Sequence, residues 1–377
     1  MSKKSARLGI SSQTIIIIVL VIIVVVLAAA YAYKVSAPSS TTTTSPTAKL
    51  AALPVICPAH PNQKLTVYFV THGAPTDPFW VPIVESSVYM GDLLNMSVIY
   101  EAPSTFSISS LVNLMQSALA AHPNGLIISV PSGTAVEPII EEAHSMGIPV
   151  IVVNVIPPPG SLPGFPYNDT LAYVGQYDYE AGVGAGQYMI KWYEQRFGTM
   201  PTQIVIFNHE PGLLGLTLRI DGIENVTKSI DPGATINVVP ISLNYADSYS
   251  IITSYLEAHP NTQLIVTLGP AGTDPAVAAV DNMHLNGKVF IMAFDIDNVT
   301  LNAIRNGTLI GTVDQQPMEQ GFMPVFEMWL YLCYGIVPQY NMTTGPFILN
   351  NNTIGLYNYQ LVASSKYLTP YLKAITG

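Results

Sequence analysis

The stretch KLTVYFVTHGAPTDPFW, residues 64–80, indicates how this chain folds. Its first part, Leu65 to Val70, is an apolar run rich in β-branched and aromatic residues, which favour strands. A polar loop with one acid, Asp77, follows, and the residues after Trp80 are predicted to form a helix. Open α/β sheets use such a strand, loop and helix to place a ligand site at the carboxyl end of a strand. The stretch therefore predicts part of a ligand site in an α/β fold.

The same alternation of strand and helix continues along the chain to residue 314. Strands that alternate with helices form parallel sheets with helices on both faces. A first set of predicted strands comprises Leu65–Thr71, Ser97–Glu101, Gly125–Val130 and Pro149–Asn154. A second set comprises Leu171–Gly175, Gln203–Asn208, Thr235–Ile241, Gln263–Leu268, Val289–Phe294 and Leu309–Val313. The Pro-rich segment 157–166 divides the two sets and is a natural crossing between domains.

The composition limits the classes of function. The chain has 377 residues, which is enough for two domains with sizeable cores. Charged residues make up 10% of it, against roughly 25% in an average soluble protein. The formal net charge of −10 argues against nucleic acid as a partner, because nucleic acid binding needs clustered lysine and arginine.

Motifs of catalysis and cofactor binding are missing from the sequence. The chain has no P-loop, no GxSxG elbow and no HExxH motif. Gly182, Gly184 and Gly186 lie inside a predicted helix, so they do not predict dinucleotide binding. His72 and His209 each follow a strand, where a lone histidine is more often a structural hydrogen-bonding residue than a catalyst. We therefore expect no catalytic residue, no metal and no cofactor, and so no enzyme.

The amino-terminal part is predicted to hold the rest of the chain outside the cell. Residues 14–30 form an almost unbroken apolar run after a cationic start, close to the ~20 residues that span a bilayer. We predict a single transmembrane helix within a membrane anchor over residues 1–35, and a Ser/Thr/Pro-rich linker over residues 36–63. A later apolar stretch, Met323 to Pro338, is predicted to be a helix of the domain core, because it is short for a membrane span and contains Glu327.

Two further features bear on an extracellular location. Each of the two cysteines, Cys57 and Cys333, lies outside any CxxC pair, which argues against a zinc site and leaves a disulfide between them open. Sequons for N-glycosylation all lie beyond the predicted anchor, which favours an extracellular glycoprotein. They are at Asn95, Asn168, Asn225, Asn298, Asn306, Asn341 and Asn351.

An internal repeat indicates two similar lobes. The segments LAAHPN (119–124) and LEAHPN (256–261) are each followed by a strand and then by a Pro-x-Gly-Thr loop. A helix-stop solution that recurs by chance is the alternative, but the shared strand and loop favour equivalent positions in two lobes. The last residues of the two loops, Thr134 and Thr273, are then expected to face one cleft from opposite sides.

From residue 64 to about residue 321 the chain resembles the type I periplasmic sugar-binding proteins, the ribose- and galactose-binding kind that feed ABC transporters. The order and spacing of several short segments carry the resemblance. These segments are Asp77–Trp80, Gly125–Ser129, Gly147–Asn154, Gly175–Gly186, Glu210–Gly212 with Arg219 and Gly222, Phe294–Asp295 and Gly311–Gln315. The resemblance implies an α/β periplasmic-binding-protein type I fold, with two Rossmann-like lobes of parallel sheet joined by a hinge.

We expect the chain to cross between the lobes three times, near Gly175, Gln316 and Gly345. Each lobe is then assembled from two separate parts of the chain. Lobe 1 is predicted to comprise residues 64–175 and 317–345, and lobe 2 residues 176–316 and 346–377.

The resemblance also implies which residues make polar contacts to a sugar. Carboxylates accept hydrogen bonds, arginine donates a planar fork, and amide side chains do both, which suits a ring of hydroxyl groups. The residues with this implied role are Asp77, Asn154, Arg219, Asp295 and Gln315. The C–H face of the sugar ring is expected to lie on Phe79 or Trp80. Further candidates for ligand contact are Thr134, Asp178 and Thr273.

These residues also have structural alternatives. Asp77 is placed to cap the helix that follows it, because Asp is a favoured N-cap residue. Trp80 is equally suited to pack in the core, and Arg219 to pair on the surface with Asp221 or Glu224. The polar residues that end apolar strands are also suited to begin turns.

We therefore predict an extracellular solute-binding component of an ABC importer. It binds a mono- or small oligosaccharide between its lobes by hinge closure, without making bonds. The expected partners are the sugar, the permease subunits of the transporter and, through the anchor, the cell membrane; we expect a monomer. A nucleoside-binding protein of the same fold and a sensory sugar receptor are the alternatives.

A second resemblance concerns the amino terminus. Residues 7–13 resemble the pilin-type signal of some archaeal sugar-binding proteins, in which a cut after Gly9 leaves the apolar stretch attached. Both the processed and the unprocessed anchor keep the protein tethered to the membrane.

Overall fold

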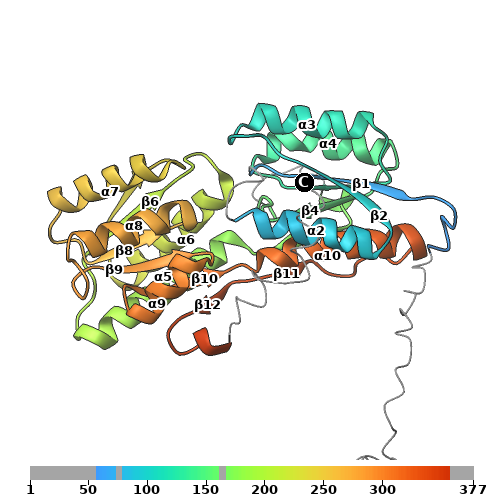
Figure 1. Cartoon of the computed structure of the whole chain (residues 1–377). Helices are drawn as coiled ribbons and strands as arrows, with labels where there is room; N and C mark the ends of the chain where they lie inside the picture. The colour runs from blue at the N-terminus through green and yellow to red at the C-terminus, as the bar shows by residue number, and fades with distance from the viewer. Residues whose placement is uncertain (1–56, 74–78, 161–166, 357–377) are drawn as a thin grey trace, which may run out of the picture. The chain divides into compact units, whose positions relative to one another are not determined.

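The computed structural model describes residues 57–73, 79–160 and 167–356 (Figure 1). The predicted membrane anchor, most of the predicted linker, Asp77 and residues 357–377 lie outside the described residues.

The described part of the chain forms two six-stranded sheets. The first has the order β11-β5-β4-β3-β1-β2, and all its neighbouring strands are parallel. Its inner strands are continuous apolar runs, as expected for a parallel sheet that is covered on both faces. The strands are β1 (Leu65–Val70), β2 (Met96–Glu101), β3 (Gly125–Ile128), β4 (Val150–Val153), β5 (Ala172–Gly175) and β11 (Met342–Thr343).

The second sheet has the order β12-β10-β9-β8-β6-β7. Its neighbouring strands are parallel, except that β12 runs antiparallel to β10 at the edge. The strands are β6 (Gln203–Asn208), β7 (Thr235–Pro240), β8 (Leu264–Thr267), β9 (Phe290–Phe294), β10 (Leu309–Asp314) and β12 (Phe347–Leu349). Each predicted strand is therefore present, with ends shifted by at most a few residues.

Helices cover both faces of each sheet, as the sequence predicts (Figure 1). One face of the first sheet carries α3 (Ile108–Ala120) and α4 (Gly133–Ser145), and the other carries α2 (Val81–Leu93) and α10 (Pro317–Tyr334). One face of the second sheet carries α5 (Asp178–Phe197) and α6 (Leu214–Ile230). The opposite face carries α7 (Tyr245–Ala258), α8 (Pro270–Asn282) and α9 (Asn298–Asn306).

The two sheets have the same strand order when β1–β5 and β11 are matched with β6–β10 and β12. The two HPN segments then precede the matching strands β3 and β8, and the two Pro-x-Gly-Thr loops follow them. The prediction that the repeat marks equivalent positions in two similar lobes is confirmed.

One grouping of the strands was wrong. The strand predicted over 171–175 belongs to the first sheet, because β5 pairs with β4 through Ile151–Ala172, Val152–Tyr173 and Val153–Val174. The Pro-rich segment before β5 is therefore a connection within one sheet and not a crossing. The chain passes between the sheets after β5, after β10 and between β11 and β12.

A disulfide joins Cys57 to Cys333, with the two Cα atoms 4.7 Å apart. The sequence left this pairing open. It attaches the first described residue to the last turn of α10, whose residues Val325 and Met328 are fully buried. The prediction of a core helix in this region is confirmed. Among the helices of the described residues, none has both the length and the apolar character of a membrane span.

Two glycines allow α5 and α6 to pack closely against each other. A Cβ atom on Gly182 would lie 2.2 Å from the carbonyl oxygen of Arg219, and one on Gly222 would lie 2.3 Å from that of Tyr179. By contrast, a Cβ atom on Gly184 would meet nothing within 4 Å. The glycine spacing in α5 thus serves helix packing, and it sets the position of the backbone that carries Arg219.

We expect Gly182→Ala to lower the free energy of unfolding by about 1–3 kcal/mol, because the added methyl group has backbone against it and no room to shift. Gly184→Ala is the matched control in the same helix and should raise it by about 0.5–1 kcal/mol, since alanine favours helix without a clash. Chemical denaturation of the full-length variants measures both. Equal effects of the two substitutions would contradict this account of the packing.

Candidate functional site

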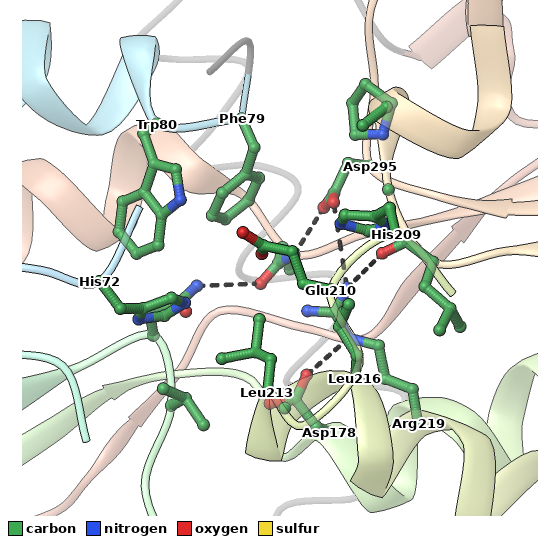
Figure 2. A pocket seen from close by; sticks show the side chains of 18 residues that line it. His72, Phe79, Trp80, Asp178, His209, Glu210, Leu213, Leu216, Arg219 and Asp295 are labelled. Carbon is green, nitrogen blue, oxygen red and sulfur yellow. Dashed lines mark hydrogen bonds and ion pairs between the residues drawn. The ribbon is translucent and has the colours of Figure 1, made fainter. Parts of the chain in front are cut away.

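A pocket lies at the carboxyl ends of strands from both sheets (Figure 2). Residues that follow β1, β4, β6, β8, β9 and β10 line it, which is where open α/β sheets bind ligands. Its empty space is about 490 Å³, including space open to solvent.

Polar residues at equivalent positions of the two sheets meet at this pocket. The strand registers define the equivalence, since β1 pairs with β3 as β6 pairs with β8, and so on around each sheet. The equivalent pairs are His72 with His209, Asn154 with Asp295, and Gln176 with Gln315. All six residues except Gln176 line the pocket.

Asn154 and Asp295 are held in the same unusual backbone conformation, with φ of 66° and 70°. Asn and Asp tolerate this left-handed region better than other residues with a side chain. Each donates its backbone N–H to a carbonyl of the neighbouring strand, at 3.0 Å and 2.8 Å. The carbonyl of Asn154 accepts a hydrogen bond from Tyr173 Oη (2.7 Å), and that of Asp295 accepts one from Thr312 Oγ1 (2.6 Å). These bonds fix both side chains at the pocket.

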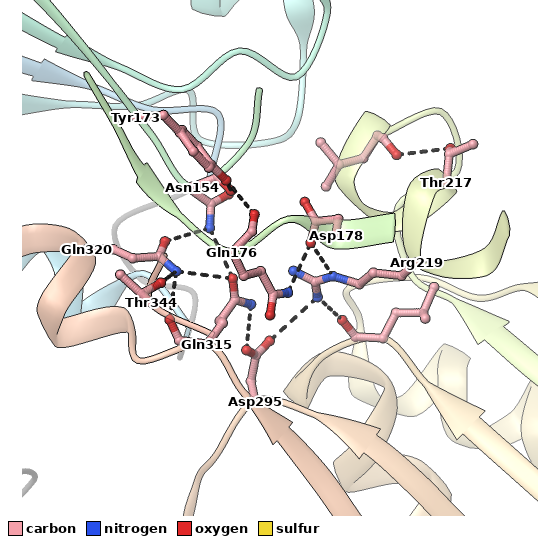
Figure 3. Close-up of polar contacts among 12 residues, drawn as sticks. Asn154, Tyr173, Gln176, Asp178, Thr217, Arg219, Asp295, Gln315, Gln320 and Thr344 are labelled. Atoms are coloured by element: carbon pink, nitrogen blue, oxygen red, sulfur yellow. Dashed lines mark hydrogen bonds and ion pairs between the residues drawn. The ribbon is translucent and has the colours of Figure 1, made fainter. Parts of the chain in front are cut away.

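Arg219 is the guanidinium of the pocket, and it is buried (Figure 3). Its Nε donates to Asp178 Oδ1 at 2.8 Å, and one terminal nitrogen donates to the carbonyl of Leu268 at 2.8 Å. The same nitrogen lies 4.0 Å from Asp295 Oδ2, and the guanidinium lies over the ring of Phe294. Burial alone would lower the pKa of Arg219, but Asp178 and Asp295 outweigh it and raise the pKa further.

The surface pairing of Arg219 with Asp221 or Glu224 is therefore not what the structure shows. Both carboxyl partners of Arg219 come from the floor of the pocket instead. Burial raises the pKa of Asp178, while the ion pair with Arg219 acts in the opposite direction.

Gln315 links the two sheets through its side-chain amide (Figure 3). Its Nε2 donates to Asp295 Oδ1 at 2.6 Å, in the second sheet. Its Oε1 accepts from Asn154 Nδ2 at 3.4 Å, in the first sheet, and from Gln320 Nε2 at 3.3 Å. Gln320 also accepts from Asn154 Nδ2 (3.0 Å) and donates to Thr344 Oγ1 (3.1 Å). Two of the passages between sheets are thus tied to the pocket by neutral amides.

Aromatic side chains form one wall of the pocket. The rings of Phe79 and Trp80 lie 5.1 Å apart and nearly perpendicular, and Trp80 contacts the ring of His72 edge-on at 4.9 Å. Trp80 is only 3% exposed and packs with the core of the first sheet while it also lines the pocket. The two roles considered for Trp80 are therefore compatible, and Phe79 offers the more accessible ring face.

The imidazole of His72 is oriented by Ser129. The hydroxyl oxygen of Ser129 accepts from the backbone N–H of His72 at 3.0 Å and lies 2.9 Å from Nδ1 of the same residue. The simplest arrangement has the buried hydroxyl donate its own proton to Nδ1, which then leaves the ring proton on Nε2. At the position equivalent to Ser129 stands Leu268, and Nδ1 of His209 has no hydrogen-bond partner among the described residues.

Two predicted contacts lie elsewhere. Thr134 is exposed in the first turn of α4 and does not line the pocket. Thr273 is fully buried, and its hydroxyl lies 2.8 Å from Thr267 Oγ1 and 2.9 Å from the carbonyl of Gly269. Both loops do occupy equivalent places, but each threonine is already inside its helix and turns away from the cleft. Asp77 lies outside the described residues.

The remaining predicted residues come together at the pocket. They are Phe79, Trp80, Asn154, Asp178, Arg219, Asp295 and Gln315.

Comparison with known proteins gives a family for this arrangement. Residues 67–335 match the model of the periplasmic binding protein domain. The chain belongs to the periplasmic binding protein family. It is 29% identical over 309 residues to the xylose/arabinose-binding protein XylF of Sulfolobus acidocaldarius, covering 80% of this chain and 74% of that protein.

Solved structures of the same fold include members with a bound cyclitol or a bound sugar. A carbohydrate transporter from Acidothermus cellulolyticus in complex with myo-inositol has a TM-score of 0.69 and 23% identity, covering 81% of this chain and all (100%) of the other. A solute-binding protein of an ABC transporter from Burkholderia graminis in complex with D-arabinose has a TM-score of 0.69 and 20% identity, covering 78% and 98%. At this level of identity the likeness shows the fold alone.

Several pocket residues of this periplasmic binding protein were missed in the sequence. The structure adds Glu210, Leu213 and Leu216, and it places His72 and His209, which the sequence put at strand ends with access to the cleft, in the lining as well. Both histidines were placed at strand ends, but the sequence offered no sign of their equivalence, which follows from strand register. The sequence Glu210–Gly212 was part of the resemblance to the sugar-binding family, but it did not indicate where the side chain of Glu210 points.

Both histidines of the periplasmic binding protein are held neutral. Burial lowers the pKa of His72 and of His209 from 6.5 to about 3, and the nearby charge of Arg219 adds to the effect. Between pH 6.5 and 3 the unfolded chain therefore binds more protons than the folded chain, so stability falls as the pH falls through this range.

We expect His209→Gln to make the loss of stability on acidification less steep, by at most about 1.4 kcal/mol per pH unit. The free energy of unfolding, measured from pH 7 to pH 4, tests this. His122→Asn is the control, since His122 is exposed and asparagine tolerates its positive φ. If the free energy of unfolding falls with pH equally steeply in wild type and in His209→Gln, the expectation is wrong. That result would show that His209 gains no proton when the protein unfolds in this pH range.

Proposed function

We propose that this protein is the extracellular solute-binding component of an ABC importer and that it binds a sugar in the pocket between its lobes. The convergence of Asn154, Arg219, Asp295 and Gln315 beside Phe79 is the observation that carries the proposal. These groups offer donors and acceptors from two sheets, and an aromatic face lies beside them, which matches a ring with hydroxyl groups at its rim and C–H groups on its face.

An aldopentose is the first candidate among sugars. The relative XylF is named for binding xylose and arabinose, and one structural neighbour holds D-arabinose. Apolar side chains of Val155, Leu213 and Leu216 line part of the pocket, where a bulky polar substituent would lose its hydration. The nucleoside alternative has no comparable support.

Binding would act by closing a hinge and would not involve bond making or a cofactor. The proposed lobes are residues 64–175 with 317–345, and residues 176–316 with 346–377. A sugar that contacts both lobes favours the closed state by its differential affinity for that state. The permease subunits of the transporter would recognise the closed form.

The amino-terminal segment would tether a monomeric receptor to the cell membrane. The proposal rests on the apolar run of residues 14–30 and on the linker that follows it. The sequons beyond this segment support an extracellular, glycosylated domain.

A thermal-shift screen of the full-length protein tests the function. Aldopentoses, aldohexoses and nucleosides are each added, and we expect one sugar at about 1,000 times its Kd to stabilise the protein by about 4 kcal/mol. Stabilisation by nucleosides alone, or by no sugar, would contradict the proposal.

Asp295→Asn tests the placement of the site. We expect it to weaken sugar binding about 100-fold, because it removes a charged acceptor from a buried pocket while keeping the shape of the side chain. Asp221→Asn on the exposed side of α6 is the matched control and should bind as wild type does. Isothermal titration calorimetry measures both, and equal affinities would place the sugar elsewhere.

A further inference from the structure

We propose that Asp274 and Asp297 share one proton, and that this proton makes sugar binding depend on the pH outside the cell. The shared proton concerns the second sheet and its helices alone. Its effect on binding rests on the proposed function, because the two acids lie next to residues that line the pocket.

The two carboxyl groups lie near the starts of neighbouring helices. Asp274 is in the second turn of α8, and Asp297 is the N-cap residue of α9. Both helices cover the same face of the second sheet (Figure 1). A hydrogen bond joins the two side chains. Ionised carboxyl groups have only acceptors, so a hydrogen bond between two of them needs a proton on one.

Asp274 is the residue that carries this proton. Asp297 Oδ1 is engaged as an acceptor, because the backbone N–H of Thr300 donates to it at 2.7 Å and so caps α9. Asp274 Oδ1 is buried and has no hydrogen-bond partner among the described residues. A buried charge without a donor is costly, whereas the neutral carboxyl group is tolerated better. Burial and the neighbouring charge of Asp297 accordingly raise the pKa of Asp274 to about 8.

The surroundings of the pair offer no compensating cation in the described part of the chain. The pKa of Asp274 is shifted by burial and by Asp297, and by no other group of the helices packed around it. The other charged or titratable residues of α7, α8 and α9 are Asp247, Glu257, Asp281, Arg305, Tyr245, Tyr249 and Tyr255. The cation in this set, Arg305, is in the last turn of α9, at the opposite end from Asp297.

The first sheet shows that the fold does not require two acids at this place. By the equivalence of the two sheets, Asp274 corresponds to Ala135 and Asp297 to Ile156. Both residues of the first sheet are apolar, and Ile156 packs against the core there. An apolar pair is insensitive to pH, so the two acids add a dependence on protons to one lobe.

Both acids are connected directly to the lining of the pocket. Residues 269–271 line it just before Asp274, and Asp295 lines it two residues before Asp297. Loss of the proton would leave two like charges side by side between α8 and α9, and their repulsion would push the helix starts apart. The lining would move with them and bind the sugar less tightly. By linkage, bound sugar would favour the protonated pair.

Asp274→Asn tests the shared proton, because its amide can donate to Asp297 without titrating. The unfolded chain ionises Asp274 above about pH 3.9, whereas the folded chain holds the proton up to about pH 8. Stability therefore falls as the pH rises through this range. Chemical denaturation of the full-length proteins from about pH 5 to pH 9 measures this. We expect the unfolding constant of wild type, divided by that of the variant, to rise by up to about tenfold per pH unit and to level off above pH 8.

Two further variants control this measurement. Asp297→Asn keeps an acceptor for the cap of α9 and should give the same rise, so it decides the outcome if Asp274→Asn does not fold. Asp247→Asn removes an exposed carboxyl group from the first turn of the neighbouring α7 and should give a constant ratio. A constant ratio for both Asp274→Asn and Asp297→Asn would overturn the shared proton. Stabilisation of wild type by calcium chloride at pH 7 that is lost in Asp274→Asn would also overturn it, because the pair would then hold a cation.

Isothermal titration calorimetry with D-xylose and D-arabinose at pH 6 and pH 9 tests the link to the pocket. We expect wild type to bind roughly tenfold more weakly at pH 9, and Asp274→Asn to bind equally at both pH values. Equal wild-type affinities at the two pH values would overturn the link. If wild type binds no sugar at either pH, the proposed function fails, and the unfolding constants still decide the shared proton.

Discussion

The buried guanidinium of Arg219 is the group around which the pocket is assembled. A buried cation is costly unless ion pairs and hydrogen bonds replace its hydration, and here they come from the start of α5, the end of β8 and the end of β9. Asp178, Leu268 and Asp295 must therefore keep their places for Arg219 to stay buried. Because α6 carries Arg219 and packs on α5 through Gly182 and Gly222, the packing of these two helices and the geometry of the pocket depend on each other.

Two sheets with the same strand order contribute equivalent residues to the pocket, and the differences between them make one side of the pocket aromatic and the other side charged. Each copy ends equivalent strands with a histidine, a residue of positive φ and a glutamine. The first copy adds Phe79, Trp80 and a serine that orients His72. The second adds Arg219 and Glu210, and its residue of positive φ, Asp295, carries a carboxyl group where the first copy has the amide of Asn154. The aromatic face and the charged face of the pocket thus come from different sheets, so a ligand that needs both must touch both.

The sequence predicted the fold further than it predicted the site. Continuous apolar strands and helix stops are local signals, so the strands and the repeat around HPN were found. Asn154 and Asp295, which the resemblance to the sugar-binding family marked as candidates, do lie at the pocket, because each directly follows a strand. The orientation of a side chain in a helix start is not local, so Thr134 and Thr273 were misplaced and Glu210 was missed. Strand β5 was grouped wrongly because partner choice between sheets depends on tertiary packing.

Gln315 gives a physical reason for ligand and hinge to be coupled. It lies immediately after β10, where the chain leaves the second sheet, and its amide bonds both to Asp295 and to the Asn154–Gln320 pair of the other sheet. A neutral amide can exchange one partner for a sugar hydroxyl at little cost, because it both donates and accepts. A charged residue at this position would fix one partner strongly and resist such exchange. The proposed hinge thus carries glutamines, and the ion pairs of Arg219 fall inside one proposed lobe, where closure would not need to break them.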